Sequence, residues 1–147
     1  TGRVYNAQTI LIKDCKNYVP VFALRKSGGI TGYIGAITNG SISFTNCINY
    51  GNVSMGDAET KQASNAGGMV SYVGSSTNEI LTFTNCINYG NITSYYIDKA
   101  TTKNAGGIVS ETYAVDSKIF NYNSYNYGTI TIAGEVKPSD YGVPTLD

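Results

Sequence analysis

The stretch that decides the fold is Thr45-Asn46-Cys47-Ile48-Asn49-Tyr50-Gly51-Asn52-Val53-Ser54, which returns as Thr84-Asn85-Cys86-Ile87-Asn88-Tyr89-Gly90-Asn91-Ile92-Thr93. A weaker copy runs from residue 122 to 131, and Asp14-Cys15-Lys16-Asn17-Tyr18 matches the phrase at an offset of 32 residues. Double glycines begin at Gly28, Gly67 and Gly106, in two steps of 39 residues. Fixed periods of this length indicate stacked arrays, in which each unit buries its apolar face against its neighbours. We therefore expect a repeat protein of about four copies.

Apolar residues alternate within each copy, as Ile42 with Phe44 and Leu81 with Phe83, which is the periodicity of a strand. A second stretch places Cys47 and Val53 on one face, and a third follows the double glycine. Three short strands, then a return to the same position one layer up, describe a parallel β-helix. The alternative, a propeller, needs about four hairpin-linked strands in each of at least four blades. The sequence predicts an all-β parallel β-helix (β-solenoid) with about three strands per coil and about four coils.

The solenoid is expected to span residues 1–132, with repeats at approximately 9–27, 28–66, 67–105 and 106–132. The variable polar segments 55–65 and 95–104 are interpreted as inserted surface loops. Residues 133–147 lose the repeat and carry Pro138 and Pro144, which oppose strand pairing. They are interpreted as a C-terminal cap or a linker.

The charge is balanced, with ten basic and ten acidic residues, and only 14% of residues are charged. There is no basic stripe for nucleic acid, no polybasic segment for a membrane surface, and no apolar run of about 18 residues that would span a bilayer. We expect no nucleic-acid partner and no direct membrane insertion. Abundant Gly, Asn, Ser, Thr and Tyr favour short strands with tight turns and an extracellular setting.

The three cysteines, Cys15, Cys47 and Cys86, occupy one repeat position, and Ser124 follows them in the last copy. Equivalent residues of stacked strands point the same way, about 4.8 Å apart, which does not turn two sulfurs toward each other. The pattern predicts a buried ladder of free thiols. Because the chain has no histidine and such ligands would not converge, we expect neither a metal site nor a cofactor.

The position before each cysteine predicts a corner, because Asn and Asp tolerate left-handed backbone geometry. We expect the side chains there to form an amide ladder inside the coil; they belong to Asp14, Asn46, Asn85 and Asn123. Gly51, Gly90 and Gly128 are expected to form the next bend with a positive φ. Val19 replaces this glycine in the first copy, so that coil is expected to bend differently.

The combination of Ala-Gly-Gly-Ile/Met-Val with Asn-Cys-Ile-Asn-Tyr-Gly-Asn resembles glycine-rich repeats, including the GLUG-type motif, of large secreted and surface proteins of bacteria such as gut Bacteroidetes and Firmicutes. The resemblance covers roughly residues 9–131 and rests on scaffold positions. It implies a secreted or cell-surface β-helical segment of a longer bacterial polypeptide, used as a stalk, a spacer or an adhesin-like part.

The tyrosines form one column in the repeat, Tyr18, Tyr50, Tyr89 and Tyr127, and are expected to face outward. Stacked aromatics stabilise neighbouring coils, and an exposed row also offers a surface to glycans or proteins of a host or of bacteria. The favoured hypothesis is a non-enzymatic, adhesin-like spacer module with this tentative ligand-binding column. The alternatives are a polysaccharide-active β-helix enzyme, using the acidic loop residues Asp57, Glu59 and Asp98, or a dedicated carbohydrate-binding module. We expect no catalytic residues, because the acids are scattered and the chain lacks a histidine base.

Overall fold

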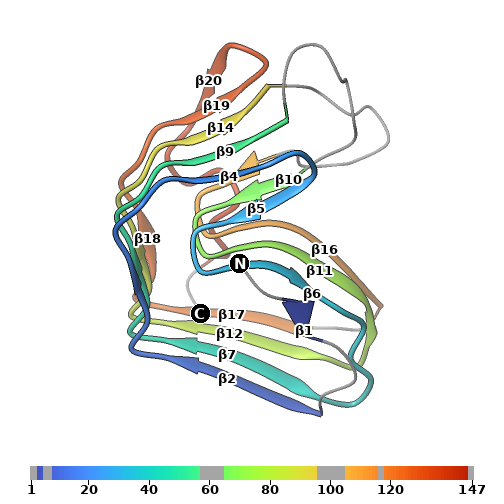
Figure 1. Cartoon of the computed structure of the whole chain (residues 1–147). Helices are drawn as coiled ribbons and strands as arrows, with labels where there is room; N and C mark the ends of the chain where they lie inside the picture. The colour runs from blue at the N-terminus through green and yellow to red at the C-terminus, as the bar shows by residue number, and fades with distance from the viewer. Residues whose placement is uncertain (1–2, 5–7, 57–64, 96–104, 116–117, 146–147) are drawn as a thin grey trace.

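The structure, a computed structural model, describes residues 3–4, 8–56, 65–95, 105–115 and 118–145. Every regular element within these residues is a β-strand, and strands of successive coils pair in parallel, which confirms the parallel β-helix (Figure 1). The sheets of the β-helix run along its axis, so residues of equal repeat position lie above one another.

The described strands form five sheets, which Figure 1 shows as successive walls of the coil. The first sheet holds β2(Thr9–Lys13), β7(Ser41–Thr45), β12(Ile80–Thr84) and β17(Lys118–Tyr122). The second holds β3(Lys16–Asn17), β8(Ile48–Asn49), β13(Ile87–Asn88) and β18(Tyr125–Asn126). The third holds β4(Val21–Ala23), β9(Val53–Met55), β14(Ile92–Ser94), β19(Ile130–Ile132) and β20(Glu135–Lys137). The fourth holds β5(Lys26–Gly28), β10(Asn65–Gly67) and β15(Ala105–Gly106), and the fifth holds β1(Arg3–Val4), β6(Thr31–Ile34), β11(Val70–Thr77) and β16(Val109–Val115).

The register follows the sequence repeat, since Phe44 pairs with Phe83 and Asn49 pairs with Asn88. The three expected stretches resolve into five shorter strands per coil among the described residues. The second stretch is divided at Gly51, between β8 and β9, and an additional strand, β10, ends at the first glycine of the double glycine. The coil therefore turns more often than the alternation of apolar residues predicts.

The buried apolar residues of the described chain form two clusters. The larger one lies between the first and fifth sheets and includes Phe44, Phe83 and Ile108. The smaller one includes Met55 and Ile92, from the third sheet. The buried asparagines Asn49, Asn88 and Asn126 lie against the second glycines of the double-glycine pairs.

The second glycine of each pair is required by this close approach. A Cβ on Gly68 would lie 2.7 Å from Asn88 Cγ, and a Cβ on Gly107 would lie 2.7 Å from Asn126 Cγ. Any larger residue would push the wall of the coil away from the asparagine column, because both contacts are below the distance that real Cβ atoms tolerate. The second glycine of each pair is therefore a packing requirement.

The corner before each cysteine has the expected left-handed backbone, with φ of 55° at Asp14, 53° at Asn46, 52° at Asn85 and 56° at Asn123. The side chains also form a ladder, because Asn46 Nδ2 donates to Asp14 Oδ1 over 2.9 Å and Asn85 Nδ2 donates to Asn46 Oδ1 over 3.3 Å. The expectation that this ladder lies inside the coil is wrong, since these side chains are exposed. A corner turns its side chain away from the core when the flanking strands both bury their apolar faces.

The positive φ expected at Gly51, Gly90 and Gly128 is also wrong, since the described glycines with positive φ are Gly56, Gly134 and Gly142. The three glycines are needed because their α-hydrogen faces the coil before. A Cβ would lie 1.9 Å from Val19 O at Gly51, 2.0 Å from Gly51 O at Gly90 and 2.0 Å from Gly90 O at Gly128. The first coil does not bend differently, because β3 and β4 keep the register of β8 and β9 around Val19.

The C-terminal segment packs on the last coils. Strand β20 pairs antiparallel with β19, and Gly107 and Val109 donate backbone hydrogen bonds to Tyr141 O (2.8 Å) and Gly142 O (3.0 Å). Asn126 Nδ2, at the end of its column, donates to Ser139 O over 2.8 Å. The segment thus covers backbone donors that would otherwise lie at the open end of the stack.

Candidate functional site: the exposed tyrosine column

The tyrosine column lies on the outer face of the second sheet. In each copy an inward asparagine is flanked by two outward residues, because side chains alternate across a strand. In the second coil Asn49 is buried, while Ile48 is half-buried and Tyr50 is exposed. The tyrosine position therefore points to solvent in every coil, as the sequence predicts.

The four rings stack directly on one another. Ring centroids are 5.0 Å apart between Tyr18 and Tyr50, 5.2 Å between Tyr50 and Tyr89, and 5.4 Å between Tyr89 and Tyr127. The interplanar angles are 6°, 7° and 15°. Stacked pairs of this kind contribute about 0.5–1.5 kcal/mol each beyond the area they bury.

Stacking decides which part of each ring faces the solvent. Tyr50 and Tyr89 are 42% and 46% exposed, whereas the terminal Tyr18 and Tyr127 are 67% and 65% exposed. The faces of the inner rings are covered by their neighbours, so these residues present ring edges to a ligand. The terminal rings have less of their surface covered.

Two further columns flank the tyrosines. On one side lie Lys16, Ile48, Ile87 and Tyr125, which share the outer face of the second sheet. On the other side lie Asn52 and Asn91, whose side-chain oxygens accept the backbone N–H of Asn91 and Thr129 over 3.0 Å. Sequence reasoning missed this asparagine ladder as part of the candidate surface, although both residues recur in the repeated phrase.

The column is held from behind by the buried asparagines. Asn17 Nδ2 donates to Asn49 Oδ1 over 2.8 Å, Asn49 Nδ2 to Asn88 Oδ1 over 2.7 Å and Asn88 Nδ2 to Asn126 Oδ1 over 2.7 Å. Each amide also donates to the carbonyl two residues later, as Asn49 does to Gly51 O over 2.7 Å. In each coil the tyrosine lies between the asparagine and the residue whose carbonyl accepts this hydrogen bond. The ladder therefore fixes the backbone from which the tyrosine ring projects.

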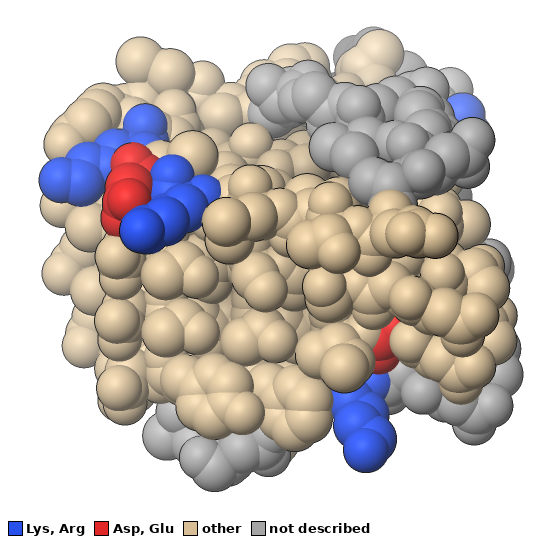
Figure 2. Space-filling view, turned by 90° about the horizontal axis from the view of Figure 1, so that it is seen from below, with Lys and Arg blue, Asp and Glu red and all other residues tan. Residues whose placement is uncertain are grey.

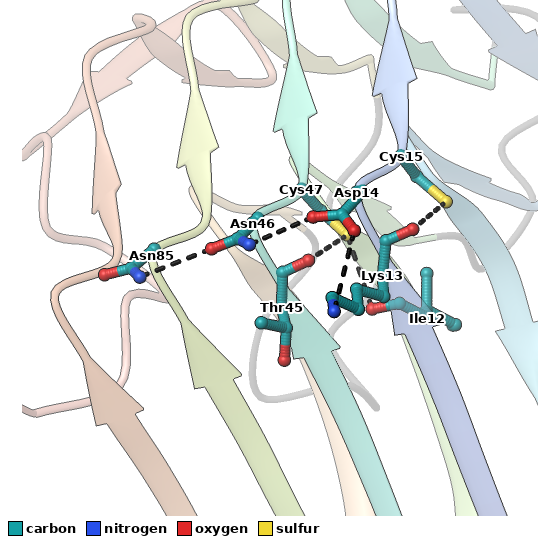
Figure 3. A network of polar contacts seen from close by, with 8 residues as sticks. All are labelled: Ile12, Lys13, Asp14, Cys15, Thr45, Asn46, Cys47 and Asn85. Atoms are coloured by element: carbon teal, nitrogen blue, oxygen red, sulfur yellow. Dashed lines mark hydrogen bonds and ion pairs between the residues drawn. The ribbon is translucent and has the colours of Figure 1, made fainter.

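The thiol column lies behind the neighbouring corner (Figure 3). Cys47 and Cys86 are buried, Cys15 is half-buried, and all three are free thiols. Cys47 Sγ donates to Thr45 O over 3.4 Å (Figure 3). Ser124 Oγ accepts the backbone N–H of Cys86 over 2.9 Å. The hydrogen bond with the Cys86 thiol and burial raise the pKa of Cys47, and burial raises the pKa of Cys15. The same hydrogen bond lowers the pKa of Cys86. Cys47 and Cys86 serve as small side chains of the larger apolar cluster, and Cys15 packs against its edge.

Charge is sparse on the side of the molecule next to the candidate surface. Figure 2 views the molecule from the side of the first sheet and shows a mostly uncharged face, with small groups of Lys, Arg, Asp and Glu toward its margins. Lys13 Nζ lies 3.8 Å from Asp14 Oδ2, but both side chains are more than half exposed, so this ion pair stabilises little. Within the described residues no group of three His, Cys, Asp or Glu side chains is arranged to hold a metal ion.

The acidic loop residues named for the enzyme alternative, Asp57, Glu59 and Asp98, lie outside the described residues, and that alternative stays a prediction. The described part of the chain has no helix with the length and apolar character needed to cross a membrane. Comparison of the chain with models of protein families, with curated proteins and with solved structures gives no match.

Proposed function

We propose that this chain is a non-enzymatic, extracellular repeat module of a bacterial surface protein, which acts as a spacer and makes adhesive contacts through the tyrosine column. The single observation that carries the proposal is the row of four stacked and exposed rings, Tyr18, Tyr50, Tyr89 and Tyr127. The bacterial and cell-surface parts of the proposal rest on the resemblance to glycine-rich surface repeats.

The mechanism is repeated weak contact along one line. Each coil presents one phenol edge with its hydroxyl, at a spacing of 5.0–5.4 Å set by the stacked rings. Contacts with a repeating partner, such as a glycan chain, add when the partner can engage several positions at once. The rigid backing by the asparagine ladder reduces the entropy lost on binding, since the rings are already held in place.

The spacer role is limited in reach, because four coils at the usual strand spacing of about 4.8 Å give a rod of about 19 Å. A long stalk would need more such modules in the same polypeptide.

The test is binding of the folded chain to an array of host and bacterial glycans and to immobilised surface proteins. The column variant is Tyr50→Ala/Tyr89→Ala, and the matched control is Tyr95→Ala/Tyr122→Ala, which removes two tyrosines of similar exposure (50% and 44%) outside the column. Binding that is lost in the column variant and kept in the control supports the adhesive role. Equal loss in both variants rejects the column, and absence of binding by the wild type removes the adhesive role.

A further inference from the structure

The N-terminal end of the tyrosine column differs from the rest of the column in three respects. Tyr18 is the most exposed of its rings, it stacks on one side only among the described residues, and a lysine precedes it where the other coils carry apolar residues. These differences concern one small patch, which consists of Lys16 and Tyr18 and which we name the first-coil patch.

The first step of the argument is the availability of a ring face. A pyranose ring stacks on an aromatic ring through its C–H face, so the aromatic face must be open. The faces of Tyr50 and Tyr89 are covered on both sides by rings 5.0–5.4 Å away. Tyr127, at the opposite end, has the ring of Tyr125 within 6.3 Å at a tilt of 36°. Tyr18 is therefore the ring of the column that is best placed to stack with a sugar.

The second step is that another coil in register cannot cover this face. Each later glycine of this corner points its α-hydrogen at the carbonyl of the coil before, and a Cβ there would come within 1.9–2.0 Å of that oxygen. Val19 holds this position in the first coil and carries a Cβ. Pro20, at the position of Asn52 and Asn91, also lacks the N–H that joins one coil to the one before in this ladder. A preceding coil would clash at this corner, although β1 does pair with β6 on the fifth sheet.

The third step is charge. Lys16 pairs in register with Ile48, which pairs with Ile87, which pairs with Tyr125, so this column holds a cation in the first coil alone. Lys16 is exposed and makes no ion pair with any residue that the structure describes. It lies on the same face as Tyr18, two residues away along the chain, because side chains of alternate residues share one face of a strand. A ligand that stacks on Tyr18 therefore meets an ammonium group beside it.

We propose that the first-coil patch binds an acidic pyranose residue, such as a uronate, with its ring on Tyr18 and its carboxylate on Lys16. This inference rests on the proposed adhesive role of the column and names the ligand class and the end of the column that takes it. The inner tyrosines then guide the following sugars by their edges and hydroxyls, and the patch fixes the end residue.

The test uses the full chain and two probes that share a ring and differ in charge: oligogalacturonate and its methyl ester. Binding is followed by NMR titration, with the ring signals of Tyr18 as the local reporter. Lys16→Ile, the residue type of the two middle coils, should weaken binding of the acid about twofold to fivefold and leave the ester unchanged, as expected for an exposed ion pair. Tyr18→Ala should weaken both probes about twofold to tenfold.

Two controls make the result specific. Lys118→Ile removes one exposed cation from the last coil and restores the residue type of its register partner Ile80, and it should leave binding unchanged. Tyr122→Ala removes an exposed ring that lies outside the column and should also leave the Tyr18 signals and the affinity unchanged. Circular dichroism confirms that each variant is folded.

The outcomes separate this inference from the proposed function. Equal binding of acid and ester, or equal loss in Lys16→Ile and Lys118→Ile, rejects the acidic ligand. Neutral glycan binding that needs Tyr50 and Tyr89 but not Tyr18 rejects the first-coil patch and keeps the adhesive column. Failure of every probe and of the glycan array rejects both.

Discussion

Replacement of Gly90 by alanine separates two physical reasons for a glycine at the second-sheet corner. The φ of Gly90 is not positive, so alanine fits the backbone conformation itself. If no steric conflict existed, Gly90→Ala would leave stability unchanged or raise it by about 0.4–1 kcal/mol, because alanine lowers the entropy of the unfolded chain. The clash with the preceding coil predicts instead that Gly90→Ala lowers the free energy of unfolding.

The magnitude follows from the geometry. The alanine Cβ would lie 2.0 Å from Gly51 O, and it must move beyond 3.0 Å, so the two coils must separate by about 1.0 Å at this corner. The hydrogen bond from Tyr89 N to Asn49 O is 2.8 Å long, and such a shift takes it past the limit of about 3.5 Å. Loss of one or two backbone hydrogen bonds at about 1 kcal/mol each, with about 1–3 kcal/mol for overpacking, gives an expected loss of about 2–4 kcal/mol.

The assay is equilibrium unfolding in urea, followed by circular dichroism, with Val19→Ala as the matched control. Val19 has the same place in the first coil, where no described coil precedes it, so Val19→Ala should change the free energy of unfolding by less than about 1 kcal/mol. A neutral or stabilising Gly90→Ala would refute the close-approach reasoning. A large loss of stability in both Gly90→Ala and Val19→Ala would also refute it, because the clash with a preceding coil explains a loss at Gly90 alone.

Three further predictions concern the ladders and the C-terminal segment. Asn88→Leu should lower the free energy of unfolding by about 2–4 kcal/mol, because the buried Gly90 O and Asn126 Oδ1 lose the side-chain N–H that donates to them. Asn85→Ala, on the exposed ladder, should lower it by less than about 1 kcal/mol in the same urea assay. The hydrogen bond with the Cys86 thiol and burial both raise the pKa of Cys47 in the folded state, so the stability that this thiol contributes is fully present below the ordinary thiol value of 9.0 and is lost as pH rises above it. Because Cys86 is coupled to Cys47 and its pKa is lowered, the test uses Cys86→Ser, in which Cys47 titrates without this partner. Urea midpoints measured from pH 7 to 10 should fall more in Cys86→Ser than in Cys47→Ser/Cys86→Ser. Gly142→Ala should detach the C-terminal segment from the start of β16, because a Cβ at Gly142 would lie 2.4 Å from Gly106 Cα and the φ of Gly142 is +68°. The amide hydrogens of Ile108 and Val109, which are bonded to Gly142 O, should then exchange faster. Unchanged exchange would exclude the proposal that the C-terminal segment covers these donors.

Much of the fold follows from the repeated phrase, and particular residues explain why. The alternation of Ile42 with Phe44 gives the first sheet, and the period gives its register with Leu81 and Phe83, because a one-residue slip would turn the apolar set outward. The left-handed corner at Asn46 was also predictable, since few residue types accept that conformation.

The buried asparagine column was predictable from the sequence, but we did not predict it. Asn49 has the same parity as Cys47 and Val53, so the strand alternation that predicts these two as buried also places Asn49 inside. A polar residue at an inward position is easily assigned to a turn, since burial of an amide is unfavourable unless partners exist. Those partners come from coils 38 and 39 residues away, and only the three-dimensional register supplies them.

Gly51, Gly90 and Gly128 show a different limit. A sequence shows that a glycine recurs, and both a positive φ and a close backbone approach explain the recurrence. The two reasons are distinguished by the distance from Cβ to the coil before, which depends on the stacking and not on the local residues. The first coil contained the evidence against a positive φ, because a valine, Val19, holds the glycine position there and the backbone bends in the same way.

The hairpin at the C-terminal end has a consequence for how the chain reaches its fold. Strands β19 and β20 form the one antiparallel pair among the described strands, joined by Ala133 and Gly134 with φ of 47° and 84°, as in the tight turns that favour hairpins. Every other described strand pair joins residues about 30–39 positions apart, so its formation must wait for a long loop to close. The hairpin can form in about 1–10 μs, far ahead of the remaining coils, and it offers β14 a ready template. We therefore expect the stack to grow from its C-terminal end, one coil at a time, with slow refolding set by the number of coils that remain to be added.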